Sequence, residues 1–469
     1  KFTLKLSEIE IMKKEIQTAI DAPSDNSKWL TMIKPHLSKV KKILIRISEW
    51  IEQKRKDTTP QRPVDDVTTT LSGWSLSSKT WKDTEISLQL LIRPDSETKS
   101  RLPDNLVIPL SKLYGTLLLL FQNNTTNCQD FNITCKLGKD DEMMILCMLP
   151  SIVFKPIANQ AHSVVLASGT MSPLDSFELE LGVKFDIKLS AAHIIDPKQV
   201  CAFTITSSLD KSLTFTSSYK KMETNGDKTF LHLGLLLEQL LKVIPDGVLL
   251  FVQSHKLLKK LIEHWKSTNL LKTLNSIKPL FYEDKHLKIH DQILEYKNKI
   301  REGRGGLFIG VCRGQLSEGI DFSDSQARSV IVFGVPNPNW NSLEVTLKIQ
   351  YNDCHSSPYA KNQLMKGLDW YESQAKRSLF QAIGRCIRHK DDYGSIILID
   401  DRYPAMISSF PQWVVKSYEK LPSTEAILNR LVVFYSKMRE QNPVSAGTSL
   451  NLNYQVTLKC IDENCNDPV

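Results

Sequence analysis

The feature that most constrains the fold of this chain is an alternation of short apolar runs with longer amphipathic segments between residues 200 and 400. The apolar runs are rich in β-branched residues, which favours buried strands; they are Cys201–Thr206, Gly247–Val252, Gly306–Cys312, Ser329–Gly334 and Tyr393–Asp400. Most gaps between them hold apolar residues at spacings of three and four, which is typical of helices; these segments are Leu231–Val243, Ser254–Trp265, His286–Arg301, Ser342–Tyr351 and Trp370–Ile387. This alternation predicts an α/β domain with a doubly wound parallel sheet.

The first part of the chain has a different character. Residues 1–57 carry two apolar stripes with helical spacing, and Leu106–Phe121 is a further apolar, helical segment. The segment from residue 57 to about residue 103 is rich in Thr, Ser, Asp and Pro, so we expect mostly loop there, with one strand-like run at Ile86–Ile92. Two short buried strands are then predicted at Met144–Met148 and Ser163–Ala167.

Composition adds little to these patterns. The chain has 469 residues, enough for two or three domains, and 60 basic against 52 acidic residues give a formal charge of +8, which favours polyanionic partners only mildly. Nine cysteines contain no Cys-x-x-Cys pair, so we expect neither a metal site nor a disulfide framework in a reduced, intracellular protein. No apolar run approaches the roughly 20 residues of a membrane span.

Polar signatures follow several of the predicted strands. Ser168–Thr170, Ser254 and Arg313–Asp321 each come directly after an apolar run. Because ligands of doubly wound sheets bind outside the carboxyl ends of the strands, these three segments are candidates for a ligand site.

The segment Gln381–His389 contains the densest group of candidate ligand-binding side chains. Helical spacing would put Gln381, Arg385 and Arg388 on one face, with Gly384 one turn before Arg388. Two guanidinium groups and an amide beside a bare glycine suit an anion such as a triphosphate. The simpler alternative is a solvated basic helix face.

The loop after the strand at Gly306–Cys312 is the second candidate. We expect its glycines to expose backbone amides to phosphate, and its carboxylates, Glu318 and Asp321, to reach a ribose or a neighbouring arginine. The alternative is an ordinary β-turn. Similarly, Ser254 and the Ser168–Thr170 segment are each equally compatible with a plain helix cap.

Four segments resemble motifs of one known family. The stretch QAIGRCIRHKDDYGSIILIDDRY, from Gln381 to Tyr403, resembles motif VI of the XPD-like superfamily 2 DNA helicases. Its sequence is most similar to that of the Fanconi anaemia group J branch. Val311–Phe322 resembles motif V, Gly247–Ser254 motif IV and Ser168–Pro173 motif III. The resemblance runs from about residue 117 to residue 403, although relatives that regulate telomere length share the same motifs.

The resemblance assigns roles to individual residues. It implies that Arg388 is an arginine finger, and that Arg385 contacts phosphate or holds the loop that contains Asp321. The remaining catalytic and nucleotide-binding candidates are Gln381, Gly384, Glu318 and Gly319. The DNA-binding candidates are Ser168, Gly169, Thr170, Ser254, Arg313 and Gly314. The family binds ATP with Mg²⁺ between two motor domains and carries a 4Fe-4S cluster.

Half of the family's machinery has no counterpart in this sequence. There is no G-x-x-x-x-G-K-[ST] phosphate loop and no Asp-Glu-Ala-His motif, and the nine cysteines lack the spacing of the cluster ligands. In the family these features precede an arch-like insertion. Together with a first residue, Lys1, that is not methionine, this suggests a chain that starts after motif II. We therefore expect the chain alone to be inactive, with the 4Fe-4S cluster outside these residues.

The resemblance also implies a division of the chain. Residues 1–145 would be an arch-type insertion with framework helices, 146–195 the end of a first RecA-like motor domain, 196–440 a second RecA-like motor domain and 441–469 a flexible tail. The complete protein would be an ATP-dependent 5′-to-3′ DNA helicase that translocates on single-stranded DNA, unwinds forked DNA and acts in DNA repair in the nucleus. Repair proteins are compatible partners, but the sequence identifies none. The alternatives are a non-catalytic nucleic-acid-binding relic of such a helicase, or another XPD-like branch.

Overall fold

The computed structural model describes residues 1–23, 28–57, 66–93, 102–121, 128–168, 174–189, 195–284, 287–317, 319–357 and 364–441. The chain divides into two compact units. The first contains Lys1–Val165, Asp175–Phe185 and Thr346–Met365, and the second contains Leu166–Leu174, Asp186–Val345 and Lys366–Val469. The boundaries that we predicted at residues 145, 195 and 440 remain predictions.

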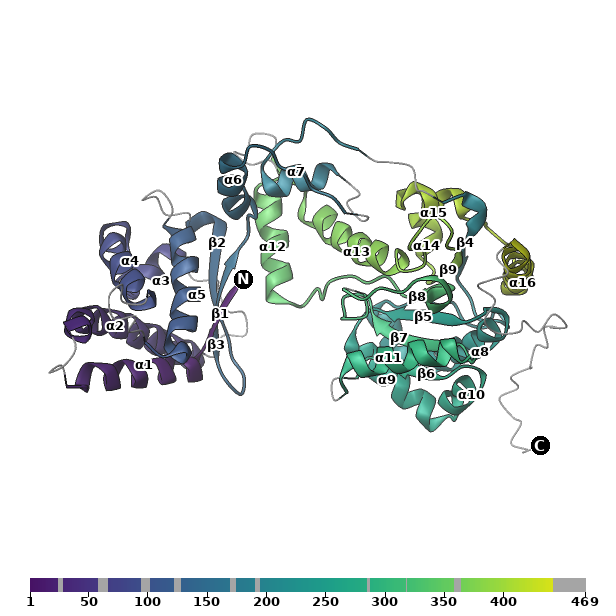
Figure 1. Cartoon of the computed structure of the whole chain (residues 1–469), viewed down its shortest axis with the longest axis horizontal. Helices are drawn as coiled ribbons and strands as arrows, with labels where there is room; N and C mark the ends of the chain where they lie inside the picture. The colour runs from purple at the N-terminus through teal and green to yellow at the C-terminus, as the bar shows by residue number, and fades with distance from the viewer. Residues whose placement is uncertain are drawn as a thin grey trace. The chain divides into compact units, whose positions relative to one another are not determined.

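The second unit is built on a six-stranded, fully parallel sheet with the order β4-β9-β8-β5-β7-β6 (Figure 1). Its strands are β4 (Val200–Ile205), β5 (Gly247–Val252), β6 (Leu280–Tyr282), β7 (Gly306–Val311), β8 (Ser329–Phe333) and β9 (Gly394–Ile399). The predicted α/β fold with a parallel sheet is therefore confirmed. The sequence pattern missed only β6 among these six, because its three residues are too few to show a periodicity.

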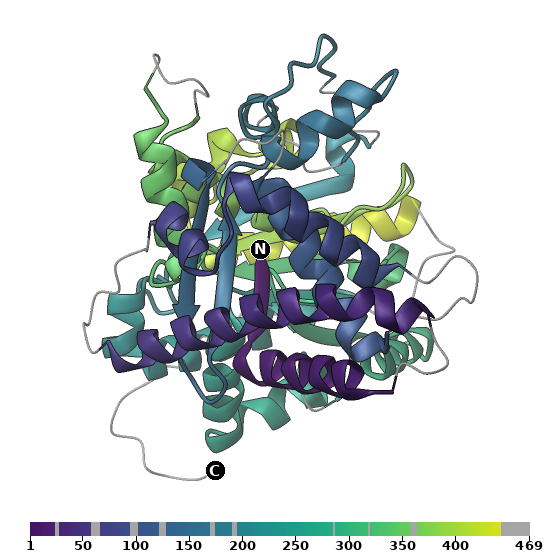
Figure 2. The same ribbon diagram turned by 90° about the vertical axis from the view of Figure 1, so that its left-hand side faces the viewer.

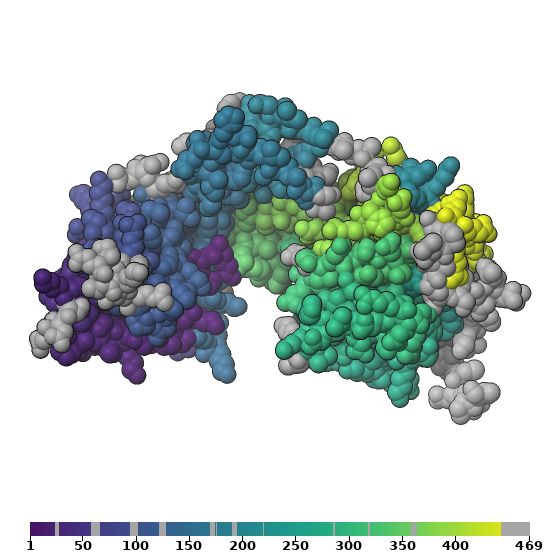
Figure 3. Space-filling view, in the orientation of Figure 1, coloured from purple at the N-terminus to yellow at the C-terminus, as the bar shows by residue number. Residues whose placement is uncertain are grey.

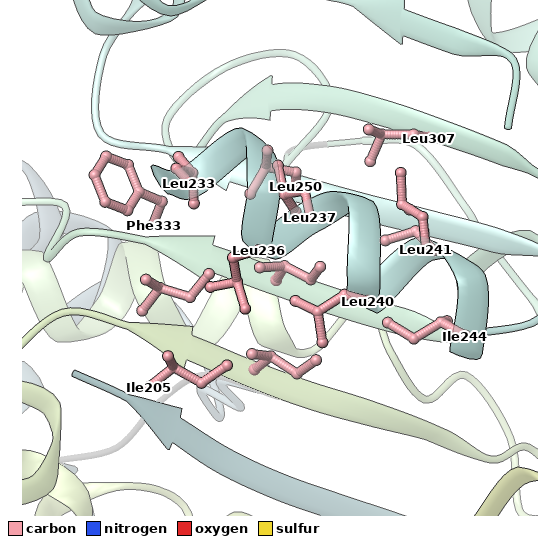
Figure 4. Close-up of a cluster of buried hydrophobic side chains, with 14 of the residues drawn as sticks. Ile205, Leu233, Leu236, Leu237, Leu240, Leu241, Ile244, Leu250, Leu307 and Phe333 are labelled. Atoms are coloured by element: carbon pink, nitrogen blue, oxygen red, sulfur yellow. The ribbon is translucent and has the colours of Figure 1, made fainter. Parts of the chain in front are cut away.

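One face of this sheet is covered by four helices. They are α8 (Tyr219–Val243), α9 (His255–Ser267), α10 (Leu270–Ile277) and α16 (Thr424–Gln441). Figure 4 shows a stripe of leucine side chains on α8 that packs against the strands. The stripe exists because Leu233, Leu237 and Leu240 recur at spacings of three and four, so they share one side of the helix.

The opposite face packs against a second set of helices. These are α11 (Ile289–Arg301), α13 (Gly367–Ile383), α14 (Tyr403–Met406) and α15 (Gln412–Ser417). Successive strand residues alternate between the two faces, so Leu250 joins the α8 side while Leu249 and Phe251 join the α13 side. With both faces buried, polar groups can gather at the two ends of the strands.

The first unit combines helices with a small antiparallel sheet, β1-β3-β2. Its strands are β1 (Phe2–Lys5), β2 (Phe131–Lys136) and β3 (Glu142–Cys147). Its helices are α1 (Leu6–Asp21), α2 (Lys28–Lys56), α3 (Val67–Gly73), α4 (Ser78–Ile92), α5 (Asp104–Leu120), α6 (Ser151–Gln160) and α7 (Asp175–Leu181). The long helices α1 and α2 lie side by side (Figure 2), and the packed side chains of this unit appear in purple and blue in Figure 3.

The helix α12 (Leu343–Cys354) has most of its residues in the first unit, which the sequence did not predict. Two hydrogen bonds account for this assignment. The Tyr351 hydroxyl donates to Asp130 Oδ1 (2.5 Å), and Lys348 Nζ donates to the Met148 carbonyl (2.6 Å).

Three local predictions were wrong. Ile86–Ile92 is the end of helix α4 rather than a strand, and helices α3 and α4 occupy much of the segment predicted as loop. The strand predicted near Met144 exists as β3, but it pairs antiparallel in the first unit. Ser163–Ala167 forms no strand, and Val165 is 85% exposed, because no described strand lies beside this segment to pair with it.

Candidate functional site

The carboxyl ends of β5, β7, β8 and β9 deliver the polar side chains of the second unit to one edge of the sheet. Gln253 and Ser254 follow β5, and the loop from Cys312 to Asp321 follows β7. Asp400 follows β9. We call this end of the strands the carboxyl edge, and the end where the strands begin the amino edge.

The loop of Cys312–Asp321 is tied to helix α13 by Arg313. Arg313 Nε donates to Ser378 Oγ (2.7 Å), and its terminal nitrogen Nη2 donates to the Gln374 carbonyl (3.0 Å). The residue is nevertheless exposed, which leaves part of the guanidinium accessible to solvent and ligands.

The prediction that Gly314 offers its amide to phosphate was wrong. Gly314 is buried, and its N–H donates to the Val311 carbonyl (2.8 Å). In contrast, Gly319 is exposed and has a φ of +77°, a conformation that glycine adopts without strain. Glu318, predicted beside it, lies outside the described residues.

Arg385 is bound to the carbonyl groups of this loop. Its Nη2 and Nε donate to the Ser317 carbonyl (2.5 and 3.2 Å), and its Nη1 donates to the Ile320 carbonyl. Of the two roles that the family resemblance allowed for Arg385, these contacts favour holding the loop.

The predicted helical face of Gln381, Arg385 and Arg388 does not exist. Helix α13 ends at Ile383, and Gly384 caps it with its N–H bonded to the Phe380 carbonyl (2.9 Å). The chain then leaves the helix, and the Arg388 N–H is bound by Asp392 Oδ2 (3.1 Å). Glycine is a poor helix former, which explains the stop at this position. The two arginines meet the same loop because of these turns and not because of a helical period.

Arg388 forms an ion pair with the end of the loop. Its Nε lies 2.7 Å from Asp321 Oδ1, and the two side chains are 60% and 59% exposed. An ion pair this accessible to water is worth at most about 1 kcal/mol. A competing anion can therefore replace Asp321 at little cost. Gln381 is half-buried and Gly384 is exposed in the same region.

The remaining predicted residues are less informative. Ser254 is the N-cap of α9, where its Oγ accepts the Leu257 N–H (3.2 Å), as its position before the helix predicted. Ser168 is exposed. Gly169 and Thr170 lie outside the described residues.

The sequence interpretation missed a cluster around Asp400. The fully buried Asp400 carboxylate accepts the Ser217 hydroxyl (2.7 Å) and two bonds from Arg402 (2.6 and 2.8 Å). Gln253 Nε2 also donates to Ser217 Oγ (2.6 Å), so the ends of β5 and β9 are joined. Burial raises the pKa of Asp400, but the Arg402 contacts outweigh it and the net pKa is lowered. An Asp-x-Arg group directly after a strand was the available signal.

The described residues fit part of a nucleotide site. Arg385 and Arg388 supply donors for phosphate, but groups of carboxylates or imidazoles able to hold a metal ion are absent from the ranges that the structure describes. Three of the described cysteines, Cys201, Cys312 and Cys386, are buried, and burial raises the pKa of each thiol. Within the described ranges, no helix has both the length and the apolar content to cross a membrane.

Comparison with known proteins agrees with the motifs. A family model described as a helicase C-terminal domain matches residues 237–417, which include the motif IV, V and VI segments. The Fanconi anemia group J protein homolog of Gallus gallus is 38% identical over 302 residues, 61% of this chain and 23% of its own length. The regulator of telomere elongation helicase 1 of Rattus norvegicus is 35% identical over 275 residues, 57% of this chain and 21% of its own length.

The chain thus spans less than a quarter of these two relatives. Among solved structures, S. tokodaii Xpd4 is 15% identical with a TM-score of 0.49, over 89% of this chain and 71% of that one. That TM-score is too low to support a conclusion. On sequence, the chain is similar to the XPD-like superfamily 2 helicases, and its residues 237–417 match the helicase C-terminal domain.

Proposed function

We propose that this chain is the C-terminal part of an ATP-dependent DNA helicase that couples ATP hydrolysis to 5′-to-3′ movement on single-stranded DNA and to unwinding of forked DNA. The complete protein would act in DNA repair in the nucleus. The name of the second relative and the description of the matching family model support the helicase activity, and the resemblance to the group J branch supports the polarity and the repair role.

The observation that carries the proposal is the pair of arginines that contact one loop, the segment after β7. Arg385 is fixed by the Ser317 and Ile320 carbonyls, whereas Arg388 has only a solvent-exposed ion pair with Asp321 described for its side chain. A guanidinium group matches the geometry of phosphate oxygens and keeps its charge at any physiological pH. Arg388 is therefore suited to exchange Asp321 for a nucleotide phosphate.

These contacts suggest different roles for the two arginines. Arg385 holds the loop in place, and Arg388 acts as the finger. Bound ATP with Mg²⁺ would supply the phosphoryl group, while Arg388 would offset the negative charge that develops on its oxygens. The remaining part of the phosphate site would come from a first motor domain.

Two groups at the carboxyl edge are suited to a DNA backbone. The N-terminus of α9, capped by Ser254, presents backbone N–H groups, and anions bind favourably at such helix ends. The exposed Arg313 adds a positive charge after β7. Contacts of this kind bind phosphate without reading the base sequence.

The experiment replaces Arg388 in the complete protein and measures DNA-stimulated ATP hydrolysis. We expect Arg388→Ala to lower turnover by roughly 10³-fold or more while ATP binding is retained, because a finger contributes mostly in the transition state. Arg388→Lys should not restore turnover, since an ammonium group lacks the planar fork. Arg304→Ala is a matched control, because Arg304 is an exposed arginine just before β7, outside the loop that Arg385 and Arg388 contact.

Several outcomes would change the assignment. Near-normal turnover in Arg388→Ala with loss in Arg385→Ala would exchange the two roles, and normal turnover in both would contradict the proposal. The 469-residue chain alone should hydrolyse no ATP, since its sequence lacks the phosphate loop. Hydrolysis by the purified chain would contradict the division of the site between two motor domains.

A further inference from the structure

Glu283 lies directly beneath the loop that binds the two arginines. It follows β6, its backbone N–H donates to the Ile309 carbonyl (3.0 Å), and the residue is only 9% exposed. Its Oε1 accepts the Leu316 N–H (2.8 Å) and its Oε2 accepts the Val311 N–H (3.3 Å). One carboxylate therefore binds both the end of β7 and the loop after it.

The contact between this carboxylate and the loop leaves no spare room. A Cβ atom at Gly314 would lie 2.4 and 2.7 Å from the two Glu283 oxygens, well inside van der Waals contact. Gly314 is thus required because the backbone lies directly on Glu283. This explains the glycine that the sequence had suggested for a phosphate contact.

The two backbone donors favour a carboxylate at this position in spite of its burial. Burial raises the pKa of Glu283, and the Leu316 amide, the nearby His255, whose Nδ1 is 3.9 Å from Oε2, and the Val311 amide offset only part of that shift. Two backbone donors need two acceptors, and only the carboxylate presents two. A glutamine could accept from Leu316, but its amide nitrogen would then face the Val311 N–H.

The position of Leu316 is transmitted to Arg385 through the next residue. Ser317 follows Leu316, and its carbonyl accepts two hydrogen bonds from Arg385. The Ser317 hydroxyl donates to the Gly314 carbonyl (2.9 Å), so the short turn behaves as one unit. A shift of Leu316 would move the Ser317 carbonyl and with it the Arg385 guanidinium.

We propose that Glu283 is a positioning residue for the helicase motor: it fixes the Gly314–Ser317 turn, which in turn holds Arg385 and presents Asp321 to Arg388. This inference rests on the proposed function, because it assigns Glu283 to the same nucleotide site. Glu283 does not contact the nucleotide itself.

The first test uses the 469-residue chain and measures hydrogen exchange of individual backbone amides. In Glu283→Ala, exchange of the Leu316 and Val311 amides should rise by on the order of tenfold or more, since bonds to a charged acceptor are lost, while amides of β4 and β9 keep their rates. Glu283→Gln should give a smaller rise at Leu316 than Glu283→Ala. The control is Glu295→Gln, an exposed acid on α11. Unchanged exchange at Leu316, or an equal rise throughout the sheet, would overturn the inference.

The second test uses the complete protein and separates positioning from folding. Glu283→Ala should lower kcat for ATP with the KM for ATP changed by less than about twofold, and Glu283→Gln should recover part of the loss. If Arg385→Ala loses turnover and Glu283→Ala does not, the inference fails and the proposed function stands. If neither Glu283→Ala nor the two arginine variants changes turnover, the proposed function fails, and the catalytic part of the inference fails with it.

Discussion

Two arginine–aspartate pairs in the second unit differ sharply in their access to solvent. At the amino edge, where the strands begin, Arg328 Nη1 lies 2.9 Å from Asp392 Oδ1 and the side chains are 1% and 2% exposed. In the second pair, Arg388 Nε lies 2.7 Å from Asp321 Oδ1 with both side chains more than half exposed. Distance does not distinguish these pairs; solvent access does.

The amino-edge pair belongs to a buried network. Arg328 also donates to the Tyr393 carbonyl (3.0 Å) and stacks on the Tyr393 ring at 3.8 Å, and its own carbonyl accepts the Tyr435 hydroxyl (2.7 Å). Removing either charge would leave the other buried without its counter-charge. The buried pair is suited to hold the fold, whereas the exposed Arg388–Asp321 pair can exchange partners.

The largest stability effect should come from the buried pair. Arg328→Met leaves Asp392 buried without its counter-charge, so we expect a loss of about 3–5 kcal/mol in the free energy of unfolding of the 469-residue chain. Urea unfolding, followed by circular dichroism, measures this loss. Adding Asp392→Leu should restore part of the stability, because a buried pair can be replaced by apolar groups. A loss below about 1 kcal/mol in the single variant would remove the contrast between the two pairs.

A smaller effect should come from Lys278, also at the amino edge, whose Nζ donates to the Asp246 carbonyl (2.6 Å). Burial lowers the pKa of Lys278 from 10.5 to about 8 in the folded chain. Above pH 8 the unfolded chain therefore binds more protons, and stability from this group rises with pH until about 10.5.

We expect the contribution of Lys278 to rise by about 2 kcal/mol between pH 7 and pH 10. Comparing unfolding free energies of the wild type and Lys278→Met over this range isolates the contribution from groups that titrate in both proteins. The difference between the two proteins should shift in favour of the wild type as the pH rises. A difference that is independent of pH would show that Lys278 has an ordinary pKa.

The smallest stability effect should come from the exposed pair. Asp321→Ala removes the exposed pair with Arg388, and we expect a loss below about 1 kcal/mol that shrinks further in concentrated salt. Urea unfolding at low and high ionic strength checks both statements. A loss above about 2 kcal/mol would mean that the pair stabilises the fold, as the amino-edge pair does.

The fold of the second unit could be predicted because its strands are buried on both faces and its helices on one. Runs such as Gly247–Val252 are then apolar throughout, and the intervening helices show their period clearly. Helix α4 could not be predicted in the same way, because its β-branched and polar residues resemble a strand or loop. Its helical form depends on Trp81 and Leu88, which are buried in the core of the first unit.

The candidate site was predicted residue by residue but not in its geometry. Arg385, Arg388 and Asp321 do meet, yet the partners of Arg385 are backbone carbonyls, which carry no sequence signal. The end of α13 at Ile383 depends on Gly384 and on the turn after it, which a simple helical period ignores. Glu283 gave no signal, because a single glutamate after a three-residue strand has no pattern around it.

The most direct test of this account measures stability and turnover on one preparation of the complete protein carrying Arg388→Ala. If the exposed Arg388 belongs to a reaction site, the unfolding free energy should stay within about 1 kcal/mol of the wild type while DNA-stimulated ATP turnover falls by roughly 10³-fold or more. A parallel loss of stability and turnover, or turnover that remains near normal, would contradict the proposed role of Arg388.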